Sequence, residues 1–122
     1  MKTSSKLVLS MLLAGAAVSH HAAWAHAALQ RATPAKDAAL SASPKEVSLR
    51  FNEKLEAAFS AVKVIDGSGH DVSSGKSALD ASDPAVLRVA VPLLPAGKYS
   101  VQWSVVGHDG HRRKGDYTFS VK

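Results

Sequence analysis

Hydrophobic and polar residues alternate with a period of two along the last quarter of the chain. In residues 99–105, Tyr, Val, Trp and Val alternate with Ser and Gln, and in residues 117–121 Tyr, Phe and Val alternate with Thr and Ser. This period is typical of a strand with one buried and one wet face. The two stretches predict two paired strands, with Trp103 at the core centre and residues 106–115 as a glycine-bounded loop between them.

Shorter patterns of the same kind occur earlier in the chain. Residues 47–51, 59–65 and 86–91 predict strands, and residues 26–33 predict an edge strand. Val72 suggests one more short strand, whereas the polar stretches 35–44 and 75–84 predict loops. Because no segment has a convincing helical period, we expect an all-β domain. The spacing favours a small antiparallel Greek-key β-barrel or sandwich, immunoglobulin-like, with about seven strands.

Composition narrows the classes of function. The 122 residues are enough for one domain, and the formal charge is +5. We expect no nucleic-acid binding, because the longest basic run is Arg112-Arg113-Lys114 and no broad basic stripe with aromatics is present. The absence of cysteine excludes disulfides and thiolate metal sites. No nucleophile triad or phosphate-cradling loop is visible, so we expect a binding protein and not an enzyme. We also expect it to be a monomer.

The first 25 residues have the pattern of a cleavable signal peptide. Lys2 and Lys6 precede an apolar run over residues 7–18, and Ala23-Trp24-Ala25 places small residues where a signal peptidase cuts. A cut after Ala27 is the alternative. We favour the cut after Ala25, which leaves residues 26–122 as an exported periplasmic domain. Both methionines are then lost, so the mature chain has no sulfur ligand.

The predicted hairpin loop carries a carboxylate and an imidazole, Asp109 and His111. Two residues apart in an extended segment lie on the same side, so both can face one metal ion. The favoured cut makes His26 the first residue, and its free amine and ring nitrogen can chelate the same ion. Three nitrogens and one oxygen suit Cu(II) in a tetragonal plane, whereas Zn(II) prefers a tetrahedron. Cu(I) would favour sulfur ligands.

At these residues the chain resembles the CopC family of periplasmic copper-resistance proteins. The resemblance covers essentially the whole mature chain, and its motifs are His26, Thr33-Pro34, Leu49-Arg50-Phe51-Asn52-Glu53, Pro95-Ala96-Gly97-Lys98-Tyr99, Trp103, Asp109-Gly110-His111 and Gly115-Asp116-Tyr117-Thr118-Phe119. Each motif is weak by itself, but the combination is specific.

The resemblance implies a seven-stranded Greek-key β-barrel with one Cu(II) ion per chain, held at the positions of His26, Asp109 and His111. Glu53 matches a family carboxylate near that site, either as a ligand or as an outer-shell partner. The resemblance also implies an inner-membrane copper importer of the CopD type as partner. Two departures are the missing methionine-rich loop and Arg112, which stands where many members have proline.

Other histidines are weaker candidates, and other functions stay open. His70 lies in a hairpin-like turn and is expected to be solvated. His108 should point away from Asp109, because consecutive strand residues face opposite sides. The leading hypothesis is a soluble carrier or buffer of Cu(II). The alternatives are a copper-dependent oxidase or monooxygenase with a histidine brace, and a metal-free interaction module.

Overall fold

The structure, a computed structural model, describes residues 27–122; the expected signal segment and His26 lie outside the described residues. Its elements in chain order are β1 (Leu29–Thr33), β2 (Ala39–Leu40), β3 (Glu46–Phe51), the 3-10 turn η2 (Ala57–Phe59), β4 (Ala61–Ile65), β5 (Ala78–Asp80), β6 (Asp83–Ala90), β7 (Gly97–Val106) and β8 (Arg112–Val121). No helix within 27–122 is long and apolar enough to cross a membrane.

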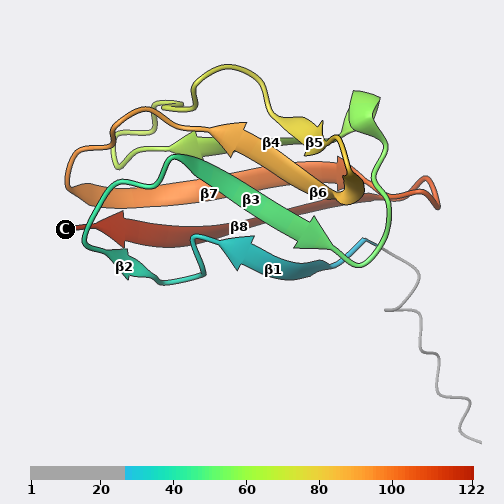
Figure 1. The fold of residues 1–122 in the computed structure, drawn as a ribbon, viewed down its shortest axis with the longest axis horizontal. Helices are drawn as coiled ribbons and strands as arrows, with labels where there is room; N and C mark the ends of the chain where they lie inside the picture. Colours follow the sequence, from blue (N-terminus) through green and yellow to red (C-terminus); the bar gives the residue numbers. More distant parts are fainter. Residues whose placement is uncertain (1–26) are drawn as a thin grey trace, which may run out of the picture.

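The strands form two four-stranded sheets packed face to face (Figure 1). One sheet has the order β1-β3-β6-β5 and the other β2-β8-β7-β4. Every pairing is antiparallel except β2 with β8, which is parallel. The predicted all-β, antiparallel-rich fold is therefore confirmed.

The core lies between the two sheets, as the period-two pattern requires. Along β7 and β8, the buried positions alternate with positions that face outward. The largest fully buried side chains come from both sheets: Phe51, Leu49 and Leu87 from the first, and Phe119 from the second. Burying such a side chain contributes about 1.5–3 kcal/mol, so alternation on several strands fixes which face of each sheet is inside.

Several predicted boundaries were wrong. Strand β4 begins at Ala61, because Ala57–Phe59 turns as η2 and leaves Phe59 60% exposed. Strands β2 and β5 lie in stretches predicted as loops, and each is only two or three residues long. The Val72 strand is absent among the described residues; its neighbour Asp71 forms an isolated bridge with Ile65. These short elements carry too few apolar positions for a period to be visible.

Trp103 is half-buried and does not occupy the core centre. Its ring packs between Phe51 and Tyr117, at centroid distances of 6.4 Å and 6.1 Å. Gly115 lies directly opposite on β8, and a Cβ there would be 2.2 Å from Cζ2 of Trp103. Gly115 was predicted to bound the loop, but it belongs to β8, where the missing side chain makes room for the indole.

Candidate metal centre

The turn between β7 and β8 holds Asp109 and His111 together. It spans residues 107–111 and is shorter than the predicted loop, because β8 already begins at Arg112. Asp109 Oδ1 accepts a hydrogen bond from the backbone N–H of His111 at 3.0 Å, and Asp109 Oδ2 lies 3.1 Å from His111 Nδ1. Asp109 and His111 are neighbours, as predicted. A turn closed by the aspartate brings them together, and not an extended segment.

These two side chains differ in their access to solvent. The Asp109 side chain is 25% exposed, whereas that of His111 is 61% exposed. The carboxylate is thus held at the base of the turn by its backbone contact, and the imidazole stands at the rim. A neutral imidazole and an ionised carboxylate are both metal donors, and a positioned carboxylate also orients an imidazole for ligation.

The segment that follows β3 runs beside this turn. The backbone N–H of His108 donates to the carbonyl of Lys54 at 2.9 Å, and that of Glu56 donates to the carbonyl of Val106 at 2.8 Å. Leu55 and Gly107 form a bridge between these hydrogen bonds. Residues 52–56 are therefore fixed against the hairpin, and they bring Glu53 to it.

Glu53 lies against Gly107 and close to Asp109. A Cβ on Gly107 would be 1.6 Å from Glu53 Oε1 and 3.2 Å from Asp109 Oδ1. The two carboxylate oxygens are therefore at most 4.8 Å apart, the sum of these distances. Position 107 must be glycine because the carboxylate fills the space of a side chain.

The position of Glu53 Oε1 fits a cation site. This oxygen is buried and has no hydrogen-bond partner among residues 27–122. A buried polar atom without a partner costs about 1–3 kcal/mol, and two nearby carboxylates repel each other when both are ionised. A bound metal ion would remove both penalties, so the donors at this turn suit a cation that prefers oxygen and nitrogen.

The chain enters the fold at the same place. Ala27 is buried, the backbone N–H of Ala28 donates to Asn52 Oδ1 at 2.7 Å, and the carbonyl of Ala28 accepts from the N–H of Asn52 at 3.0 Å. In Figure 1 the start of β1, the end of β3 and the β7–β8 turn lie at one end of the sandwich. Asn52 thus anchors the start of the described chain next to Glu53.

The described residues supply part of the predicted ligand set. Asp109 and His111 are brought together, and Glu53 lies beside them, but no three His, Asp or Glu side chains within 27–122 form a complete metal-binding group. His26, the remaining predicted ligand, lies outside the described residues and directly precedes Ala27. Sequence reasoning missed Asn52 and Gly107 as positioning residues; Asn52 was visible only as part of the Leu49–Glu53 motif.

The other histidines have different partners. His108 is exposed and its Nδ1 lies 3.8 Å from Glu56 Oε1. His70 is exposed in the turn after β4, with Nδ1 3.7 Å from Asp66 Oδ2. That carboxylate also accepts the backbone N–H groups of His70 and Ser68, which lower the pKa of Asp66. The expected solvated position of His70 is confirmed.

Comparison with known proteins identifies the family of the chain. The CopC domain model matches residues 29–122. The chain belongs to the CopC domain family. Protein YobA of Escherichia coli K12 is 39% identical over 102 residues, which are 81% of each chain. Copper resistance protein C of E. coli is 35% identical over 107 residues, covering 82% of this chain and 84% of that protein.

Solved structures of related proteins show the same fold. The crystal structure of CopC from Methylosinus trichosporium OB3b superposes on this chain with a TM-score of 0.74 at 35% sequence identity. The superposition covers 80% of this chain and 94% of the CopC chain. The two-sheet fold is therefore that of the family, whose members include copper-resistance proteins. The family supports copper binding as the coarse function.

Proposed function

We propose that this CopC protein is an exported, periplasmic copper carrier or buffer that binds one Cu(II) ion. His26 supplies its amine and ring nitrogen, and Asp109 and His111 supply the other donors. Glu53 is an outer-shell partner or a weak ligand. The buried, unpartnered Oε1 of Glu53, within 4.8 Å of Asp109, is the observation that carries the proposal.

The start of the chain supports the position of the remaining ligand. Consecutive Cα atoms are about 3.8 Å apart. Ala27 is buried, and Ala28 is hydrogen-bonded to Asn52, the residue before Glu53. His26 is bonded directly to Ala27, and this supports it as the remaining ligand. Export with cleavage after Ala25 would give it the free amine that a chelate requires.

The decisive experiment compares two proteins, one that starts at His26 and one with a single added glycine before it. The added residue turns the amine into an amide, a poor donor unless it is deprotonated. We expect Cu(II) affinity to fall by at least the roughly 10–100-fold that is typical of outer-shell changes, while the thermal unfolding of the metal-free protein stays the same. Equal Cu(II) affinity would remove the amine from the site.

Substitutions in the turn test the other donors. His111→Ala and Asp109→Ala should each weaken Cu(II) binding in a competition titration. His70→Ala is the matched control, because His70 also faces a carboxylate but lies in a different turn. If the control weakened binding as much as His111→Ala, the ligand assignment would be wrong.

Oxidation state separates a carrier from an oxidase. Without sulfur ligands the mature chain should bind Cu(II) far more tightly than Cu(I), which opposes redox cycling. Hydrogen peroxide produced from ascorbate by the copper-loaded protein, in excess of free copper controls, would favour an oxidase. The proposed recipient of the copper is an inner-membrane importer of the CopD type, and the proposed functional unit is a monomer.

A further inference from the structure

The two sheets of the sandwich differ in charge. The strands of the β1-β3-β6-β5 sheet carry three basic and three acidic residues: Arg31, Arg50, Arg88, Glu46, Asp80 and Asp83. The strands of the β2-β8-β7-β4 sheet carry five basic residues and one acidic residue: Lys63, Lys98, Arg112, Arg113, Lys114 and Asp116. The net charge that the strands carry is therefore concentrated on the second sheet.

On the first sheet five of the six charges are paired, and Arg31 is the exception within 27–122. Arg50 forms an ion pair with Asp83, and Arg88 bridges Glu46 and Asp80. Asp80 accepts hydrogen bonds from Ser82 and from Arg88. These bonds, those from Ser82 above all, lower the pKa of Asp80 to about 2. This face has little charge left to offer to a partner.

On the second sheet the lysines are unpaired. Lys63, Lys98 and Lys114 form no ion pair within 27–122, although Lys63 is near enough to contribute to the lowered pKa of Asp71. Lys63 and Lys98 stand next to buried residues, and Lys114 is in phase with the outward positions 116, 118 and 120 of β8. The three lysines therefore share the outer face of the sheet, together with Asp116. Ammonium groups on long stems, spread over one face of a sheet, form an extended positive surface.

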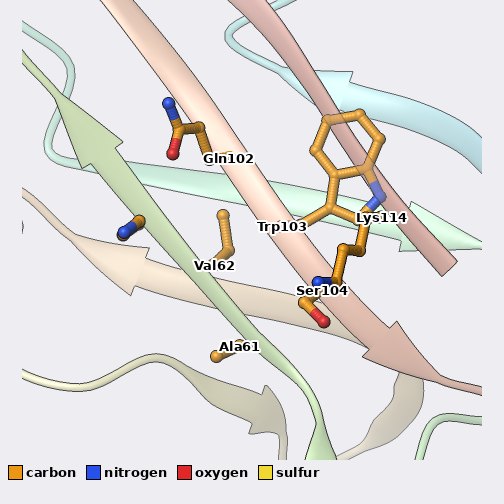
Figure 2. A pocket seen from close by; sticks show the side chains of 7 residues that line it. Ala61, Val62, Gln102, Trp103, Ser104 and Lys114 are labelled. Atoms are coloured by element: carbon orange, nitrogen blue, oxygen red, sulfur yellow. The ribbon is translucent and has the colours of Figure 1, made fainter. Parts of the chain in front are cut away.

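This face contains a shallow hollow of about 420 Å³ that is mainly apolar. Figure 2 shows Ala61 and Val62 of β4, Gln102, Trp103 and Ser104 of β7, and Lys114 of β8 around it. Lys63 completes the lining. The ammonium groups of Lys63 and Lys114 can bind a phosphate group, and the amide of Gln102 and the apolar surface can contact the glycerol backbone attached to it.

We propose that the outer face of the β2-β8-β7-β4 sheet, defined by Lys63, Lys98 and Lys114, docks onto an anionic phospholipid bilayer. Charge complementarity selects this occupant: the partner presents an extended negative surface, and the strands of this sheet carry five basic residues and one acidic residue. The β7–β8 turn extends from the same sheet, so docking holds the candidate metal centre beside the membrane. The inference does not depend on the ligand set proposed for copper.

Vesicle co-sedimentation tests this docking with the protein that starts at His26. We expect binding to vesicles containing phosphatidylglycerol, none to pure phosphatidylcholine, and loss of binding between about 0.1 M and 1 M salt, where the screening length falls from about 10 Å to 3 Å. Each lysine near such a surface contributes about a fivefold gain in binding. Lys63→Gln/Lys98→Gln/Lys114→Gln should therefore weaken binding by roughly 100-fold.

The matched control is Lys36→Gln/Lys45→Gln/Lys122→Gln, which removes the same charge from exposed positions outside the strands. It should lose far less binding than the face variant. Equal losses in the two variants, or no binding of the unsubstituted protein to anionic vesicles, would overturn the proposal. Cu(II) titration of the face variant should be unchanged, so a failure of docking and a failure of the copper site are distinguishable.

Discussion

Replacing Glu53 with glutamine should change stability and copper affinity in opposite directions. Oε1 of Glu53 is buried without a hydrogen-bond partner among the described residues, within 4.8 Å of Asp109 Oδ1. Glu53→Gln replaces a carboxylate with a neutral amide that costs less to bury and can donate to Asp109. The penalty for an unpartnered buried group is about 1–3 kcal/mol, so we expect the metal-free protein to gain about 1 kcal/mol.

The same substitution removes a negative charge that a bound cation would use. The loss of an outer-shell carboxylate typically weakens metal binding by about 10–100-fold. At saturating Cu(II), this reduces the stabilisation by the metal by about 1.4–2.7 kcal/mol. For a domain of this size 1 kcal/mol corresponds to about 4–8 °C in Tm, so both effects exceed the error of a thermal scan.

The assay is thermal unfolding with and without a saturating excess of Cu(II). Glu53→Gln should raise the Tm of the metal-free protein and decrease the upward shift caused by Cu(II). Glu56→Gln is the control, because Glu56 is 49% exposed and pairs with His108 at the surface. A lower Tm for metal-free Glu53→Gln, together with an unchanged Cu(II) shift, would refute the role assigned to the buried oxygen.

Three further outcomes are expected. Gly107→Ala should displace the carboxylate of Glu53, because a Cβ would lie 1.6 Å from Oε1, and Cu(II) titration should show at least about tenfold weaker binding. Gly115→Ala should lower stability by about 1–3 kcal/mol through overpacking against Trp103, measured by denaturant unfolding followed through its fluorescence. Hydrogen bonds hold the pKa of Asp80 at about 2, below its usual 3.8, so its stabilisation is present above pH 3.8 and lost as pH falls towards 2; Asp80→Asn should flatten the dependence of Tm on pH in that window.

Gly67→Ala is the common control for the two glycine substitutions. A Cβ there would meet only a carbonyl oxygen of Lys98, at the ordinary distance of 3.9 Å. It should leave Cu(II) affinity, fluorescence and stability nearly unchanged. A Gly67→Ala protein as destabilised as Gly115→Ala would show that the loss arises from glycine replacement in general and not from contact with the indole.

The sequence by itself determined the fold class and the strands that form the core. Alternation along β3, β7 and β8 assigns an inner face to each strand, because burying apolar side chains is the dominant favourable term. It also indicated Asp109 and His111 as neighbours, but for the wrong reason: an extended segment was expected, whereas a turn closed by Asp109 brings them together. Short elements such as β2 and β5 were not visible, because two or three residues carry no measurable period.

Tertiary structure decided how the candidate site is assembled. Glu53 and Asp109 are separated by 56 positions in the chain, and no local pattern reports that Gly107 leaves space for the carboxylate between them. The same holds for Trp103: its alternation predicted the core centre, but Gly115 across the β7–β8 pair and Phe51 from the other sheet set its half-buried position. Distances between strands of different sheets depend on packing, whereas the period of a single strand depends only on its own residues.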